Sequence, residues 1–227
     1  MKYNLERYSH LLDRLNSEDG KFERFDEGEM TGIVLRHDVD LSPLAALRMA
    51  KQEQNKDITS TYFFLLGESI YNAASREVRG IISQIERMGH EIGLHFNTHR
   101  YWETHPGKEQ VQVAVQEECT ILSALINGDV TVVSFHIPPS WVLGEQYSGF
   151  TSTYEPRFFG DHCYVSDSKQ KWRQLNPFDG DVPQEHQVVI HPGLWSHQDA
   201  HLEPLYQAFQ DKAIEEIHDY FEQFSVE

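Results

Sequence analysis

The stretch Leu35-Arg36-His37-Asp38-Val39-Asp40 follows two further apolar residues and predicts a buried strand that ends in two carboxylates. Successive side chains of a strand alternate between its two faces, so Asp38 and Asp40 point to the same side. Such a pair offers hard oxygen ligands for a metal, or one ligand and one general base. Acidic residues also follow strands as helix caps, and either Asp40 or Ser42 fits that simpler interpretation.

A second stretch, Gly89-His90-Glu91-Ile92-Gly93-Leu94-His95-Phe96-Asn97-Thr98-His99, combines a predicted strand with an H-x-x-x-H pair. Two imidazoles and one carboxylate, with positions left open for water and substrate, suit Zn²⁺, or Fe²⁺, Co²⁺ or Ni²⁺. His95 and His99 alone are a weak signal, and so are the two Asp residues. Their occurrence at the ends of neighbouring predicted strands indicates a metal site. His90 and Glu91 are interpreted as a turn residue and a strand-start carboxylate that faces away from it.

Predicted strands alternate with predicted helices along the chain, which favours an α/β fold with a parallel sheet. Polar residues fall at the carboxyl ends of the strands, the layout of a (β/α) barrel with its site on one rim. Strands are expected at 33–40, 58–66, 90–96, 130–136, 162–166 and 187–191, and helices at 3–16, 75–88, 107–126 and 202–224, with a further helix from Pro43. The rim residues are Asp38, Asp40, His95, His99, His136, Asp167 and His191.

The chain of 227 residues is expected to be a single domain, with a leading helix and loop at 1–30 and a closing helix at 202–227. Its formal net charge is −17, with 19 basic and 36 acidic residues, which disfavours nucleic acid and anionic membranes as partners. We find no apolar signal segment and no apolar run long enough to span a membrane, so a cytoplasmic location is expected. Cys119 and Cys163 are expected to be buried thiols.

Taken together, these motifs resemble those of the polysaccharide deacetylases of the NodB-homology type, carbohydrate esterase family four. Residues 35–40 resemble the family's acidic first motif, and residues 89–99 resemble its second. Three later stretches follow in the family's order: Phe135–Pro139, Ser166-Asp167 with Trp172 downstream, and Val189–Pro192. The resemblance covers about residues 33–195, and it implies a distorted barrel with about seven or eight strands.

The resemblance also implies roles for single residues. Asp40, His95 and His99 would hold a divalent metal, with zinc expected and cobalt, nickel or iron as alternatives. Asp38 would be the general base, and His191 the general acid, oriented by Asp167. His136 stands where the family has an arginine that holds the catalytic aspartate, and it would tune Asp38 instead. Either Pro139, which has no N–H, or Ser140 takes the place of the family's oxyanion donor.

These roles imply a metal-dependent hydrolase of a non-peptide amide bond, which deacylates an N-acylated amino sugar or its nucleotide- or lipid-linked precursor in surface glycan metabolism. One alternative is a metal hydrolase of another small amide, such as a formamide. Another is a barrel that binds metal or carbohydrate without turnover. The expected partner is a small-molecule or carbohydrate substrate, and no oligomeric state is predicted.

Overall fold

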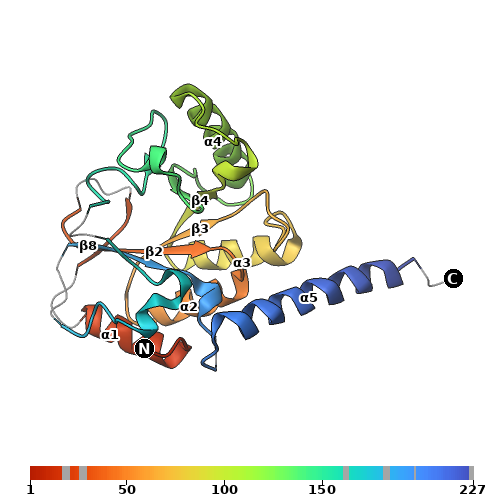
Figure 1. Ribbon diagram of the computed structural model, residues 1–227, viewed down its shortest axis with the longest axis horizontal. Helices are drawn as coiled ribbons and strands as arrows, with labels where there is room; N and C mark the ends of the chain where they lie inside the picture. The colour runs from red at the N-terminus through yellow and green to blue at the C-terminus, as the bar shows by residue number, and fades with distance from the viewer. Residues whose placement is uncertain (17–20, 26–29, 161–163, 181–184, 197, 225–227) are drawn as a thin grey trace.

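The computed structural model describes residues 1–16, 21–25, 30–160, 164–180, 185–196 and 198–224, and it has an α/β fold. Figure 1 shows strands in the middle of the body and helices around them. The α-helices formed by the described residues are α1 (Leu5–Asn16), α2 (Pro43–Gln54), α3 (Arg76–Arg87), α4 (Lys108–Ser123) and α5 (Leu202–Glu222).

The strands form one parallel sheet, in the order β6-β5-β4-β3-β2-β8-β7, with β1 paired to β2 beside this path. Its two end strands, β6 and β7, leave the barrel open, so the predicted distorted (β/α) barrel is confirmed. The strands are β1 (Phe22–Glu23), β2 (Ile33–Val39), β3 (Thr61–Phe64), β4 (Glu91–Phe96), β5 (Val132–Phe135), β6 (Thr151–Ser152), β7 (Tyr164–Ser166) and β8 (His186–Ile190).

Strand β2 lies between β3 and β8, and all seven of its residues are buried. Helices cover such a parallel sheet, so the whole strand, including the polar Arg36, His37 and Asp38, is shielded from water. The predicted starts of the helices are also observed. The Ser42 hydroxyl accepts a hydrogen bond from the Ala45 N–H at the start of α2, and Ser75 does the same for α3. Gly89, with a φ of +93°, follows α3 and turns the chain into β4.

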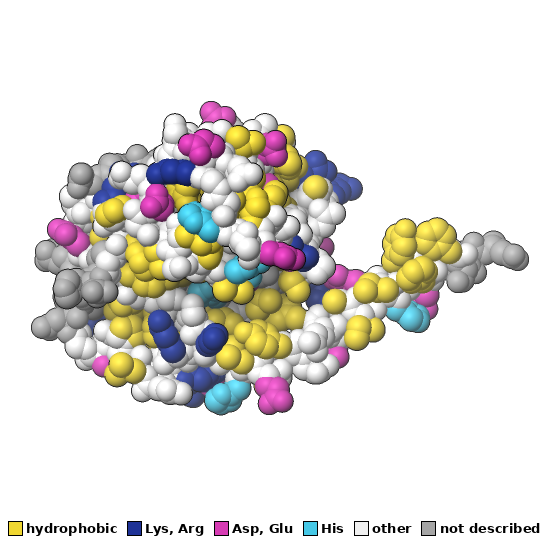
Figure 2. Space-filling model, turned by 45° about the horizontal axis from the view of Figure 1, so that its top comes forward, with side chains coloured by type: hydrophobic (Ala, Val, Ile, Leu, Met, Phe, Trp, Pro, Cys, Tyr) yellow, Lys and Arg dark blue, Asp and Glu magenta, His cyan; other side chains and the backbone are white. Residues whose placement is uncertain are grey.

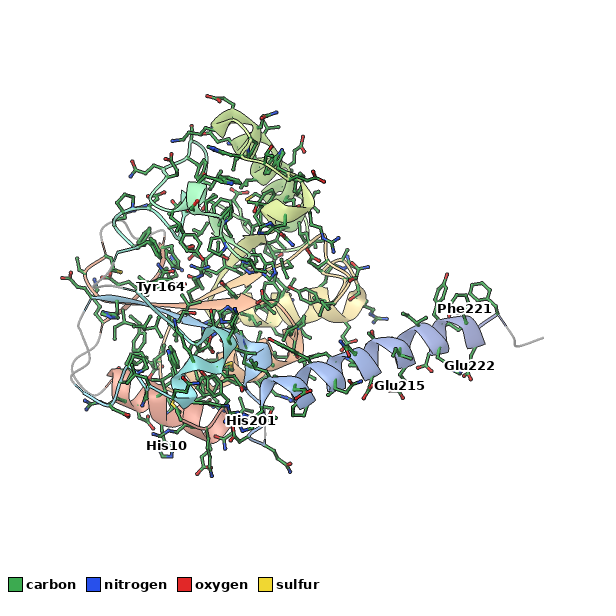
Figure 3. The ribbon with its side chains drawn as sticks, viewed as in Figure 1. His10, Tyr164, His201, Glu215, Phe221 and Glu222 are labelled. Carbon is green, nitrogen blue, oxygen red and sulfur yellow. The ribbon has the colours of Figure 1, made fainter. Side chains whose placement is uncertain are left out.

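Helix α5 differs from the closing helix that the sequence predicts. None of its residues, all of which the structure describes, is buried. Figure 1 shows α5 extending away from the body, and Figure 3 places Phe221 and Glu222 near its remote end. Its first turns touch the body, where Leu202 and Leu205 pack against the core and Tyr206 lines a cavity. The apolar period predicted the helix correctly, but it carries no information on the direction in which the helix leaves the barrel.

The remaining expectations from the sequence have mixed outcomes. Strand β1 was not predicted, because two residues are too short for a period-two pattern. Cys119 is a free, buried thiol, as expected, whereas Cys163 and the start of the strand expected at 162–166 lie outside the described residues. Among the described helices, none has both the length and the apolar character needed to cross a membrane.

Candidate metal and catalytic site

Side chains from neighbouring strands converge at the carboxyl end of β2 because they share the inner face of the sheet. The alternation along β2 places Arg36, Asp38 and Asp40 on this face. The register of the sheet pairs His95 of β4 with Ser134 of β5, so these two side chains also lie together. On the side of the molecule that Figure 2 shows, histidine and hydrophobic side chains lie around a hollow near the middle of the body. The cavity has a volume of about 480 Å³, and Asp38, Asp40, His95, His136 and His191 are among its lining residues.

Three groups with the chemistry of metal ligands meet in this cavity. The Asp40 Oδ1 atom lies 3.0 Å from His95 Nε2 and 3.1 Å from His136 Nδ1, and the two nitrogens are 3.2 Å apart. Zinc bonds of about 2.0–2.1 Å in tetrahedral geometry place ligand atoms roughly 3.3 Å from each other. The donor atoms and their spacing therefore fit a divalent metal of the zinc type.

The hydrogen bonds around His95 fix the tautomer that metal binding requires. Ser134 Oγ donates to Asp38 Oδ1 at 3.2 Å and lies 2.6 Å from His95 Nδ1. Because the single hydroxyl proton goes to the carboxylate, Ser134 must accept from His95 Nδ1–H. In a neutral imidazole this leaves the lone pair on Nε2, which faces Asp40 and His136.

His99, which the resemblance implies as a metal ligand, does not belong to this group of converging atoms. It lies in the short 3₁₀ helix η2 (Thr98–Arg100), and its Nε2–H donates to the carbonyl oxygen of Ile137 at 3.0 Å. The geometry therefore offers His136, and not His99, as the third ligand. The H-x-x-x-H spacing did not reveal this, because η2 turns the chain away from the strand direction just after β4.

The residue that holds Asp38 is Arg36, which the sequence analysis missed. The Arg36 Nε and Nη2 atoms donate to the two Asp38 oxygens at 2.8 Å each, and the guanidinium is fully buried. Arg36 also donates to Gln187 Oε1 and to the Tyr154 hydroxyl, both at 2.9 Å. The sequence feature that could have predicted this contact is the position of Arg36 two residues before Asp38, because residues i and i+2 of a strand share a face.

Arg36 and the histidines control the charges of the two aspartates. Burial works against the ionised form of Asp38, but the adjacent Arg36 guanidinium outweighs it and lowers the pKa of Asp38 below its usual value. Burial likewise opposes the charge on Asp40, but the adjacent His136 and His95 side chains outweigh burial and lower the pKa of Asp40. Burial disfavours the imidazolium of His136, whereas Asp40 raises the pKa of His136 overall. Both carboxylates are therefore ionised at neutral pH.

His191 and Asp167 form a second unit on the opposite side of Asp40. His191 Nδ1 lies 2.5 Å from Asp167 Oδ1, and Trp195 Nε1 donates to Asp167 Oδ2 at 2.7 Å. The outer nitrogen of the imidazole, Nε2, lies 4.0 Å from Asp40 Oδ2. Burial opposes the positive charge on His191, but Asp167 outweighs it and raises the pKa of His191 to about 9. A buried carboxylate thus holds a protonated imidazole beside the three converging ligand groups.

Comparison with known proteins found no matching family model and no matching curated protein. Among solved structures, the chain is similar to a CE4 family pseudoenzyme from Bacillus anthracis, with 15% identity and a TM-score of 0.47 over 82% of this chain and 62% of that one. It is also similar to the peptidoglycan deacetylase PdaC from Bacillus subtilis (12% identity, TM-score 0.47, 86% of this chain and 98% of that one). A third is the chitin deacetylase from the fungal pathogen Colletotrichum lindemuthianum (12% identity, TM-score 0.48, 83% of each chain). The chain spans less than two thirds of the length of the first of these structures.

Proposed function

We propose that this protein is a metal-dependent amide hydrolase that removes the acyl group from an N-acylated amino sugar. The observation that carries the proposal is the juxtaposition of two units across Asp40. Oδ1 of this residue faces His95 and His136, while its Oδ2 faces the protonated His191. Amide hydrolysis needs these two functions side by side, since the carbonyl must be polarised and the leaving amine must gain a proton.

Asp40, His95 and His136 would hold the metal, with zinc as the expected ion and cobalt, nickel or iron as alternatives. A divalent metal bound there supplies Lewis-acid polarisation of the acyl carbonyl and makes water more acidic. His191 would donate its Nε2 proton to the leaving amine, while Asp167 holds the imidazole by its Nδ1–H. Asp38 lines the same cavity and would accept the proton of the attacking water, with Arg36 holding its carboxylate in place.

The pairing of Arg36 with Asp38 supports a modification of the roles implied by the motifs. In the deacetylases that the motifs resemble, an arginine holds the catalytic aspartate. His136 stands at the position of that arginine, so the motifs imply that His136 holds Asp38. Arg36 makes the contact from within the same strand, which leaves His136 free to act as a ligand. The substitution of His136 for the family's arginine is therefore no argument against turnover.

Turnover of N-acylated amino sugars by the metal-loaded protein tests the proposal directly. We expect release of the carboxylic acid from N-acetylglucosamine derivatives, loss of this activity after chelation, and its return with added Zn²⁺. Asp38→Asn is expected to abolish turnover, because an amide cannot accept the proton from water. Metal binding without turnover on any acylated amino sugar, formamide or cyclic amide would instead identify the protein as a binding barrel.

A further inference from the structure

Ile137, the residue that follows His136, has an unusual backbone conformation. Its φ is +44°, in the left-handed region, where the branched Cβ of isoleucine crowds the backbone. The side chain is 68% exposed, so burial in the core does not compensate for this strain. Strained residues of this kind cluster at functional sites, where the surrounding structure holds them in place.

The contact that holds Ile137 comes from His99. The Nε2–H of His99 donates to the Ile137 carbonyl oxygen at 3.0 Å, and the backbone N–H of His99 is in turn bound by the Asn97 side chain at 3.1 Å. This hydrogen bond joins the segment after β4 to the segment after β5. The second histidine of the H-x-x-x-H pair thus presents an exposed isoleucine beside the metal ligands.

Ile137 belongs to a group of apolar residues that line one side of the cavity, Leu65, Ile70, Ile137 and Pro138, which we call the apolar wall. The carboxylate of Glu68, which is paired with Arg100, also lines the cavity between Leu65 and Ile70 in the sequence. Ile70 is also exposed, at 46%. These residues follow β3 and β5, so they lie on the His95 and His136 side of Asp40. His191 follows β8, on the other side of β2, where Ser168 and Lys169 also line the cavity.

This arrangement gives the bound amide a direction. Its carbonyl belongs at the Asp40–His95–His136 group, and its nitrogen belongs at His191, which lies beyond the other oxygen of Asp40. The amine and its sugar then extend toward the polar residues that follow β7. The substituent on the carbonyl carbon extends in the opposite direction, toward Ile137 and Ile70.

We propose that the apolar wall binds the acyl chain of the substrate, so that the enzyme selects acyl groups longer than acetyl. This inference rests on the proposed function, because it takes the reacting group to be an amide at the Asp40 group. The exposed isoleucines lose their contact with water when the chain binds, and this loss is the source of the selectivity. Each additional methylene that becomes fully buried is expected to raise affinity about fourfold.

Binding of straight-chain carboxylates, from formate to hexanoate, tests the wall without requiring turnover. Calorimetry on the zinc-loaded protein should give an affinity that rises with each methylene, by roughly twofold to fourfold for partial to full burial. Ile137→Asn and Ile70→Asn should flatten this rise. Asparagine tolerates the left-handed conformation, so the Ile137 variant is expected to fold, and Ile137→Gly provides a second test at the same position.

Ile121→Asn is the matched control, because Ile121 is 56% exposed on α4 and does not line the cavity. It should keep the wild-type rise. An affinity independent of chain length in the wild type, or an unchanged rise in both wall variants, would overturn the proposal.

Rates on a matched series of N-acyl glucosamines separate this inference from the proposed function. If amides are cleaved but the rate is highest for formyl or acetyl, the wall does not bind the acyl chain, and the hydrolase assignment stands. If the carboxylates show the chain-length effect while no amide is cleaved, the apolar site stands and the hydrolase assignment fails. Both assignments are supported if kcat/KM rises with acyl length and Ile137→Asn removes that rise.

Discussion

Arg36 and Asp38 form a buried ion pair on the inner face of β2, and both side chains are almost completely shielded from water. Removal of one partner leaves an uncompensated charge in the interior, which typically costs about 3–5 kcal/mol. We therefore expect Arg36→Met to lower the free energy of unfolding by this amount, as measured by urea denaturation. The double variant Arg36→Met/Asp38→Asn should be more stable than Arg36→Met alone. Additive effects of the two substitutions would show that the pair is not coupled.

At His191 the expected effect is on the leaving group. His191→Ala should slow cleavage of amides, whose amine must be protonated, by roughly 10²–10⁴-fold. The loss on activated esters should be much smaller, because their leaving groups need little protonation. Asp167→Asn should also slow cleavage of amides more than cleavage of activated esters, but by a smaller factor. His10 is exposed, so His10→Ala should leave the rates on amides and on esters unchanged. An equal loss on both substrate types would make His191 a positioning residue. His197, a second histidine to consider for this role, lies outside the described residues.

Between the elements, a buried carboxylate joins α2 to the sheet and to α1. Glu53 of α2 accepts hydrogen bonds from the Ser60 hydroxyl at 2.6 Å, from the Tyr62 hydroxyl at 2.9 Å and from the Tyr8 hydroxyl. His37 Nε2 lies 2.8 Å from it. Burial alone would raise the pKa of Glu53, but His37, together with His90 and the Ser60 hydroxyl, outweighs burial and lowers this pKa to about 2.

This shift predicts the effect of acid on stability. A carboxyl group whose pKa is lower in the folded state stabilises the protein above its unfolded pKa, here about 4.5, and loses this contribution as the pH falls toward 2. Glu53→Gln should therefore be less stable than wild type at pH 7, and the difference should shrink between pH 4.5 and 2. Unfolding free energies across this range provide the measurement, with exposed Glu109→Gln as the control. A difference that grows on acidification would contradict the assigned direction.

Helix α5 provides a prediction about a whole element. Its outer apolar residues are exposed, and Phe221 is 64% exposed. A chain that ends after Gln207, which retains the cavity-lining Tyr206, should keep the wild-type unfolding free energy within about 0.5 kcal/mol. A chain that ends after Glu222 is the control. A much larger loss in the shorter chain would mean that α5 packs on the body in solution.

At the scale of the molecule, the sequence predicted the features that arise from short-range periodicity. The alternation of strands and helices predicted the parallel barrel, and the D-x-D and H-x-x-x-H motifs located the rim where the site forms. The sequence did not reveal that His136, rather than His99, converges with Asp40 and His95, because this arrangement depends on the turn of η2 after β4. The two-residue period of a strand places Arg36 on the same face as Asp38. However, a charged residue is ordinarily expected at the surface, so the sequence did not indicate a buried ion pair.

We propose that Asp40, His95 and His136 form the metal site of this protein. Calorimetric titration of the metal-free protein with Zn²⁺ tests it most directly, with His136→Ala and His99→Ala compared in the same buffer. We predict that wild type and His99→Ala bind one equivalent with similar affinity, while His136→Ala loses most of its affinity, since it lacks one of three ligands. Retained binding in His136→Ala together with its loss in His99→Ala would contradict this account and restore the ligand set that the motifs imply.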